Sequence, residues 1–192
     1  MITIKKYNKS YAEKWDNFIS ISNNGTIFQT RKFLGYHITR KFKDHSLIIT
    51  KNTTIIAVIP GVKRQNNKTY YSHPGISYGG LVIKKGISFE RIHQIIKSLD
   101  IYLIKHKFKK IYLINSPSIY WKEEEQSLDY LLQWNKYQIK ERYISHVSNI
   151  AHCKTVESLL SKRKRRYIVN DSQLNNFTFK KIKNHNELIK LY

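Results

Sequence analysis

The sequence has almost no cysteine and no long apolar run. Cys153 is the single cysteine among 192 residues, so no disulfide can form within the chain. No apolar stretch approaches the roughly 20 residues that a bilayer-spanning helix needs, and residues 1–6 lack the apolar core of a signal sequence. These absences lead us to expect a soluble, cytoplasmic protein.

Acidic residues are also scarce. The chain has 13 Asp and Glu against 35 Lys and Arg, which gives a net charge of +22. This charge predicts an anionic partner such as nucleic acid, an anionic membrane surface or a phosphorylated substrate. The alternative is compositional bias, since Lys, Asn and Ile are abundant together, as AT-rich coding DNA favours. No helix-turn-helix, zinc-finger or RNP pattern supports a nucleic-acid-binding fold.

The composition predicts a packed α/β protein. Hydrophobic residues make up 41% of the chain and aromatic residues 13%, enough for a core. The length fits one domain, or one domain and the start of another. We expect a first domain over residues 1–155. Residues 156–192 should then form a basic helix over 156–169, a strand over 177–179 and the beginning of a helix over 184–192. The strand and the last helix would start a second unit, which a truncation could have cut short.

Helices and strands are expected to alternate along the chain. Apolar residues recur at helical spacing over residues 11–21, 31–38, 88–106 and 127–134, with a capping box at Ser10 and Glu13 and a helix cap at Thr30. A bend is expected at Pro60-Gly61. A strand–helix–strand crossover around residues 88–106 would make the sheet mixed. The expected strands cover residues 2–7, 46–50, 54–59, 62–64, 69–72, 81–83, 110–114 and 138–152.

Two stretches resemble a known family. The first is WDNFI at 15–19 followed by NGTIFQT at 24–30. The second is AVIP at 57–60 followed by YSHPGISYGGLV at 71–82. Together they resemble the first domain of Fem-type (GNAT-like) N-acyltransferases, in which a strand ends in Pro and a later turn has an S-x-P-x-x-x-Y-G-G pattern.

The resemblance implies a fold and an activity. It implies a GNAT-like mixed, mostly antiparallel sheet flanked by helices, usually duplicated within one chain. It also implies transfer of an acyl or aminoacyl group from acyl-CoA or aminoacyl-tRNA to an amine. The acceptor would be a cell-wall precursor or a surface-polysaccharide amino sugar, linked to a nucleotide or a lipid.

The chain departs from the pattern in one respect. It lacks the Arg/Gln-x-x-Gly-x-Gly/Ala loop that cradles the pyrophosphate of CoA in GNAT enzymes, because Gly75, Gly79 and Gly80 have the wrong spacing. We therefore expect an acceptor-binding half that works with a missing second GNAT-like domain. A non-catalytic binding or specificity domain and a basic nucleic-acid-binding protein are the alternatives.

The segment from residue 70 to residue 80 is the main candidate site. An amine must lose a proton before it attacks a carbonyl, and the imidazole of His73 suits that role, while the Tyr78 hydroxyl could donate to the leaving group. A turn that packs on the sheet is the alternative. The residues expected to contact substrate are Tyr70, Tyr71, Ser72, Gly79 and Gly80.

Two basic groups are candidate anion sites. Arg31 and Lys32 begin an expected helix, where they could hold a phosphate or carboxylate together with backbone N–H groups. Arg163, Arg165 and Arg166 could contact a diphosphate, a tRNA backbone or lipid headgroups. A solvated helical surface is the alternative for both groups.

No metal site is expected. His146 and His152 share one face of an alternating strand, but Cys153 points to the other face. No carboxylate or second cysteine completes a tetrahedral set of ligands.

Overall fold

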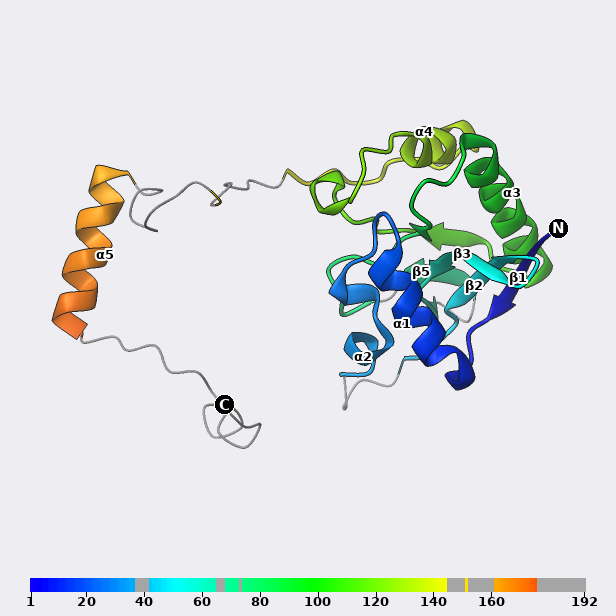
Figure 1. Ribbon diagram of the computed structural model, residues 1–192, viewed down its shortest axis with the longest axis horizontal. Helices are drawn as coiled ribbons and strands as arrows, with labels where there is room; N and C mark the ends of the chain where they lie inside the picture. Colours follow the sequence, from blue (N-terminus) through cyan, green and yellow to red (C-terminus); the bar gives the residue numbers. More distant parts are fainter. Residues whose placement is uncertain (37–41, 65–67, 73, 145–150, 152–160, 176–192) are drawn as a thin grey trace. The chain divides into compact units, whose positions relative to one another are not determined.

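A computed structural model describes residues 1–36, 42–64, 68–72, 74–144, 151 and 161–175 (Figure 1). The chain divides into two compact units, Met1–Lys140 and Glu141–Tyr192. The first unit contains all the described strands, and the second contains one described helix.

Two sheets form the centre of the first unit. The first is antiparallel, in the order β1-β2-β3-β6, and the second has the order β4-β5-β7, with β4–β5 antiparallel and β5–β7 parallel. Pro60 separates β3 from β4, so one nearly continuous stretch of chain contributes to both sheets. The strands are β1 (Ile2–Lys6), β2 (Leu47–Lys51), β3 (Thr54–Ile59), β4 (Gly61–Arg64), β5 (Thr69–Ser72), β6 (Val82–Ile83) and β7 (Lys110–Tyr112).

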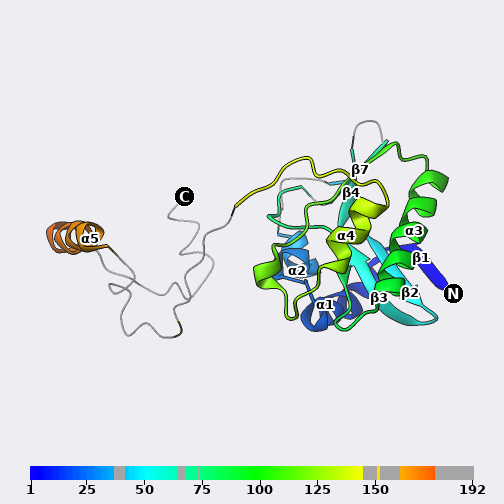
Figure 2. The same ribbon diagram turned by 90° about the horizontal axis from the view of Figure 1, so that it is seen from above.

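Helices cover both faces of the first sheet. On one face Trp15, Phe18 and Ile19 of α1 pack against Ile48 and Val58. The alternate strand residues point to the other face, where they form the larger core with α3 and α4. These two helices lie side by side (Figure 2). The helices of this unit are η1 (Lys9–Tyr11), α1 (Ala12–Ile21), η2 (Ile27–Gln29), α2 (Arg31–Leu34), α3 (Phe89–Lys105), η3 (Ser118–Tyr120) and α4 (Ser127–Trp134).

The expected mixed, mostly antiparallel α/β fold is confirmed. The crossover helix α3 leads into β7, as its apolar spacing predicted. The parallel partner of β7 is β5, whereas β6, which directly precedes the helix, pairs antiparallel with β3. Residues 73–81 therefore carry the chain from one sheet to the other.

Three local predictions were wrong. Asn8, and not Ser10, caps the first helical turn, because its side chain accepts from the Ser10 N–H. Helix α2 ends at Leu34, since Gly35 forms its C-cap. Of the strand expected over residues 138–152, residues 138–144 form none, because all their side chains are exposed and no buried face holds them against a sheet. Residues 145–150 and 152 lie outside the described part of the chain.

The second unit contains helix α5 (Lys162–Asn175). It overlaps the carboxyl-terminal part of the basic helix expected over residues 156–169. The other elements expected in the tail, a strand at 177–179 and a helix start at 184–192, lie outside the described residues.

Candidate functional site

The turn that leads from Ser72 to Leu81 contains the Gly79-Gly80 pair, and we call it the glycine turn. Both of its ends are hydrogen-bonded to the chain that follows β7. The Gly79 N–H donates to the Ile114 carbonyl at 2.9 Å, and the Ile114 N–H donates to the Ser72 hydroxyl at 2.8 Å. The Leu81 N–H donates to the Asn115 side-chain oxygen at 3.2 Å. These bonds hold Ser72 at one end of the turn, and Gly79 and Leu81 at the other, against the chain that follows β7.

Gly79 and Gly80 are needed for this close packing. Gly80 has φ +62°, and a Cβ there would lie 2.3 Å from the Asn115 side-chain oxygen. A Cβ on Gly79 would lie 2.8 Å from the Ser72 Cβ. Both glycines are also buried. Close packing of Gly79 on Ser72 and of Gly80 on Asn115 is thus sufficient to explain why both positions are glycine. The expected contact of this pair with substrate stays a prediction.

Two buried amide side chains join the stretches that carry the family resemblance. The Asn24 side chain donates to the Leu81 carbonyl and accepts from the Ile83 N–H, both at 2.8 Å. The Gln29 side chain donates to the Gly79 carbonyl at 3.1 Å, and the Trp15 indole N–H donates to the Gln29 carbonyl at 2.7 Å. These bonds connect residues 15–29 to residues 79–83 in one hydrogen-bonded network.

Aromatic rings from three segments pack together beside this hydrogen-bonded network. The ring centroids of Phe28 and Tyr78 are 5.6 Å apart, and those of Tyr78 and Tyr120 are 5.9 Å apart. Phe33 lies 5.1 Å from Phe28 and 5.2 Å from Tyr36. We call these five residues the aromatic surface. Tyr36 is 57% exposed and Tyr120 is 50% exposed, so a ligand can reach the rings at its edge.

Tyr78 joins the turn to the aromatic surface. Burial raises its pKa above the ordinary tyrosine value, and repulsion from an ionised Tyr120 and a hydrogen bond with Tyr120 raise it further. The Tyr78 hydroxyl is therefore protonated at neutral pH. His73, the expected base, lies outside the described residues.

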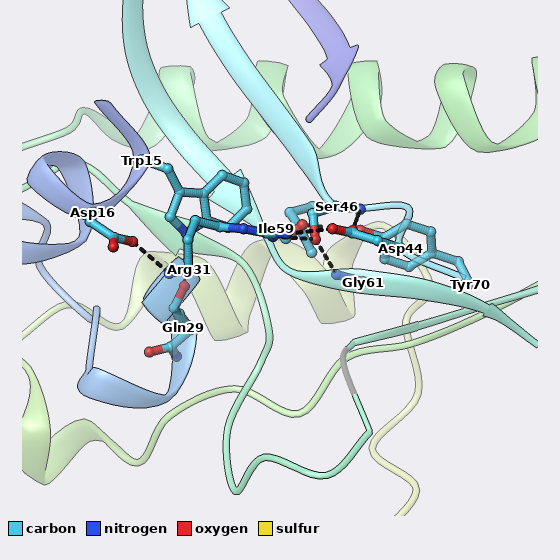
Figure 3. A network of polar contacts seen from close by, with 9 residues as sticks. All are labelled: Trp15, Asp16, Gln29, Arg31, Asp44, Ser46, Ile59, Gly61 and Tyr70. Carbon is cyan, nitrogen blue, oxygen red and sulfur yellow. Dashed lines mark hydrogen bonds and ion pairs between the residues drawn. The ribbon is translucent and has the colours of Figure 1, made fainter. Parts of the chain in front are cut away.

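Arg31 lies in a polar network within the protein (Figure 3). Its guanidinium forms an ion pair with Asp44 and donates to the Ser46 hydroxyl at 3.0 Å. It also stacks 3.6 Å from the ring centroid of Tyr7. The Arg31 guanidinium is thus already engaged, whereas the neighbouring Lys32 is exposed.

The Arg31 network affects the acidity of Asp44. Burial acts to raise the pKa of Asp44, but the Arg31 charge and the hydrogen bonds from Ser46 and Arg31 outweigh it, so the pKa lies below its usual range. Asp44 is ionised at neutral pH, and Arg31 balances its charge. The expected role of Arg31 in ligand binding stays a prediction.

Replacing Arg31 with lysine should destabilise the protein by about 1 to 2 kcal/mol. Lysine keeps the charge but loses the planar group that stacks on Tyr7 and reaches Asp44 and Ser46 together. Urea unfolding measures this. The matched control is Lys32→Ala, an exposed neighbour that should change the stability by less than about 0.5 kcal/mol. Equal effects of the two substitutions would show that the network contributes nothing.

The adjacent tyrosines of β5 point to opposite faces of their sheet. Tyr70 is fully buried, and its hydroxyl donates to the Ile59 carbonyl at 3.2 Å. That placement leaves no surface of Tyr70 for a ligand, contrary to the expectation from the sequence. Ser72 is likewise buried, whereas Tyr71 is partly exposed on the other face.

A buried histidine next to Tyr70 was missed by the sequence analysis. His45 is 4% exposed, its Nε2 lies 3.0 Å from the Tyr102 hydroxyl, and its Nδ1 has no hydrogen-bond partner. Burial, followed by the charge of Lys63, lowers the pKa of His45 to about 4. An isolated histidine in a polar sequence context has no periodicity that marks it as buried, so pattern analysis could not identify it.

The basic residues expected to bind anions lie on helix α5. Residues 162–168 are all exposed, including Arg163, Arg165 and Arg166. Arg163, Arg166, Tyr167 and Asn170 line the same face, as spacing of three and four residues requires. The structure thus presents this group to solvent, and its ligand stays a prediction.

Neither a metal site nor a membrane span is found in the described part of the chain. Within it, His, Cys, Asp and Glu form no group of three or more that could hold a metal ion. No helix there is long and apolar enough to cross a membrane. His146, His152 and Cys153 lie outside the described residues.

Comparisons with known proteins give only distant likenesses. No protein-family model matches the chain, and no curated protein matches it. Among solved structures, the chain is similar to aminoglycoside N-acetyltransferase AAC(6')-Iy in complex with CoA, with 14% identity and a TM-score of 0.47. This match covers 77% of the chain and 95% of the transferase.

Two other solved structures show a similar degree of likeness. An aminoglycoside acetyltransferase from an uncultured soil metagenomic sample, in complex with trehalose, has 12% identity and a TM-score of 0.41, with 77% of this chain and 95% of that one covered. A mutant protein from Thermus thermophilus has 7% identity and a TM-score of 0.44, with 77% and 97% covered. TM-scores below 0.5 do not establish a shared fold, and the activities named belong to those proteins.

Proposed function

We propose that residues 1–140 form a GNAT-like domain that binds the amine acceptor in an N-acyl or aminoacyl transfer reaction. The observation that carries this proposal is the hydrogen bonding of Asn24 to Leu81 and of Gln29 to Gly79. These bonds join the two stretches that resemble Fem-type acyltransferases. The order of strands, with a crossover helix between two parallel strands, agrees with the fold that the resemblance implies.

The acceptor would bind on the aromatic surface. Aromatic rings suit the apolar faces of sugar rings, and the Tyr78 and Tyr120 hydroxyls offer hydrogen bonds at the same place. The acceptor class that follows is a cell-wall precursor or a surface-polysaccharide amino sugar, linked to a nucleotide or a lipid. In the reaction the amine nitrogen attacks the acyl carbonyl and forms the amide bond, the donor's ester or thioester bond breaks, and the proton lost by the amine is taken up by the released hydroxyl or thiol.

The donor would bind elsewhere. Ser88 closes the amino terminus of α3 by accepting from the Arg91 N–H, and Glu90 places a negative charge in its first turn. Both features make that helix end a poor site for a pyrophosphate. This favours an acceptor-binding role for the described unit, with acyl-CoA or aminoacyl-tRNA held by another domain. A domain that binds the acceptor without turnover is the alternative, and an acyl-transfer assay distinguishes the two.

A thermal-shift panel at fixed salt tests the proposal. The ligands are acetyl-CoA, a UDP-linked amino sugar, a UDP-linked muramyl peptide, tRNA and inorganic phosphate. A ligand at ten times its Kd stabilises the native state by about 1.4 kcal/mol, which for a chain of this size raises Tm by roughly 3 to 6 °C. We expect such a shift with one of the UDP-linked compounds.

The variant Tyr78→Leu should remove that shift. The matched control is Tyr130→Leu, a tyrosine on α4 that is 52% exposed and lies outside the aromatic surface. It should leave the shift unchanged. Shifts with tRNA and phosphate alone, abolished by added salt, would instead show that the positive charge is the whole basis of binding, and the proposal would be wrong.

A further inference from the structure

Two tyrosines lie side by side on one face of the β4-β5-β7 sheet. Tyr71 of β5 is in register with Tyr112 of the parallel strand β7, and their ring centroids are 5.8 Å apart. Their strand neighbours Tyr70 and Ile111 point to the opposite face, where Tyr70 is fully buried. Tyr71 and Tyr112 are both partly exposed on this face, which also carries the buried Val62, the β4 residue opposite Tyr71.

Two cations lie over the rings of this pair, and a third is on the same face of the sheet. The Arg64 guanidinium lies 4.5 Å from the ring centroid of Tyr71, and the Lys140 ammonium lies 5.3 Å from that of Tyr112. Lys110 precedes Tyr112 by two residues on β7 and so shares its face. All three cations are exposed. The ion pairs among the described residues join Arg31 to Asp44 and Lys85 to Glu123, so none of them neutralises these cations.

We propose that this face binds single-stranded nucleic acid. Every nucleobase has a π-face that stacks on an aromatic side chain, and sheets that present aromatic rings on adjacent strands bind unpaired bases in this way. The phosphates that follow those bases are matched by Arg64 and Lys140, whose charges lie over the rings of Tyr71 and Tyr112. The long side chains of Arg64 and Lys140 can leave the rings to contact phosphate when a base stacks there.

The combination of rings and cations selects among anions. Free phosphate would use the cations and leave the tyrosines without a role. A duplex keeps the faces of its bases stacked inside the helix, so it cannot use the rings. The proposed site recognises bases by stacking and phosphates by charge, and it does not use hydrogen bonds to the edges of the bases. We therefore expect it to bind different base sequences with similar affinity. This inference is independent of the acyl-transfer proposal, which concerns the aromatic surface around Tyr78.

Fluorescence anisotropy with a labelled 12-nucleotide oligo(U), using the full chain, tests the proposal. Replacing both tyrosines, as Tyr71→Leu with Tyr112→Leu, should weaken binding about tenfold or more, because each stacked base loses its platform. The double change to phenylalanine keeps the rings and should retain the affinity. Tyr130→Leu, the exposed tyrosine on α4, is the control that should have no effect.

The salt dependence tests the cations separately. Removing Arg64 and Lys140 together should lower the slope of log K against log salt by about 1.4, because each phosphate contact on a single strand contributes about 0.7. The control removes Lys97 and Lys105, which are exposed on α3, and should leave the slope unchanged. The salt-slope measurement also tests the proposal if the double leucine variant does not fold.

Three results would overturn the proposal. One is equal binding of an RNA duplex of the same length. Another is unchanged affinity when both tyrosines become leucine in a folded protein. The third is loss of binding only when the basic residues 162–166 of α5 are neutralised, which would assign binding to charge on that helix.

Discussion

Replacing Gly80 with alanine should destabilise the protein by about 2 to 5 kcal/mol. Two costs combine. Gly80 has φ +62°, a conformation that costs alanine about 1 to 2 kcal/mol. The new Cβ would also lie 2.3 Å from the side chain and 2.8 Å from the Cα of Asn115, and forcing such a contact costs about 1 to 3 kcal/mol. Urea unfolding measures the sum.

Gly86 provides a matched control for this experiment. Its φ is +64°, nearly the same as that of Gly80, but a Cβ there would meet nothing within 4 Å. Gly86→Ala should therefore cost only the conformational part, about 1 to 2 kcal/mol. The difference between the two variants isolates the contact between the glycine turn and Asn115. Equal losses in the two variants would show that the turn does not pack on this segment.

The second large effect is a dependence of stability on pH that comes from His45. The pKa of this buried imidazole is about 4, against about 6.5 for the side chain in the unfolded chain. Between these values the unfolded state binds a proton that the native state does not, so stability falls as pH falls from 6.5 to 4. The lost stability approaches about 3 kcal/mol.

His45→Leu should remove this dependence. Leucine fits the apolar surroundings of Tyr70 and Phe108 and cannot take up a proton. The free energy of unfolding of the wild type, measured by urea at intervals from pH 4 to pH 7, should rise with pH more steeply than that of the variant. The pKa of Asp44 lies below its usual range, so its contribution is lost only at lower pH. Parallel curves for the two proteins would contradict the assignment.

Most of the secondary structure could be predicted because its patterns are local. The bounds of β3, β5 and α4 match the prediction, and α3 differs only in its capping residues. In α3 the apolar spacing marks the buried face directly, as the burial of Ile92, Ile96 and Leu99 shows. Thr30 was also predicted correctly as the cap of α2, because its signal lies within four residues of the helix start.

The candidate site could be predicted only in part, because its contacts are long-range. Alternation shows that Tyr70 and Tyr71 face opposite ways, but it does not say which one is buried until Phe108 and His45 are placed beside Tyr70. Asn24 likewise looks like an ordinary turn residue in the sequence, yet its side chain bonds to the backbone of residues 81 and 83. The Gly-Gly pair was expected to contact substrate, and the structure places Ser72 beside Gly79 and Asn115 beside Gly80, contacts that no local pattern could indicate.

The same distinction applies to the charged residues. The sequence could not separate Arg31, whose partners are within the protein, from Lys32, which is exposed, because the partners of Arg31 at Asp44 and Ser46 follow from tertiary packing. The sequence also offered no reason to select Arg64 or Lys140 among its scattered lysines and arginines. The structure singles out Arg64 and Lys140 by the aromatic rings they lie over.

Titration of a UDP-linked amino sugar and a UDP-linked muramyl peptide, followed residue by residue through backbone amide chemical shifts, tests the central claim most directly. That claim is that the acceptor binds on the aromatic surface, beside the hydrogen bonds that join Asn24 and Gln29 to the glycine turn. It predicts saturable shifts concentrated at Phe28, Tyr78 and Tyr120 with at least one of the two compounds. Shifts confined to the basic residues of α5, or the absence of saturable shifts with both compounds, would contradict it.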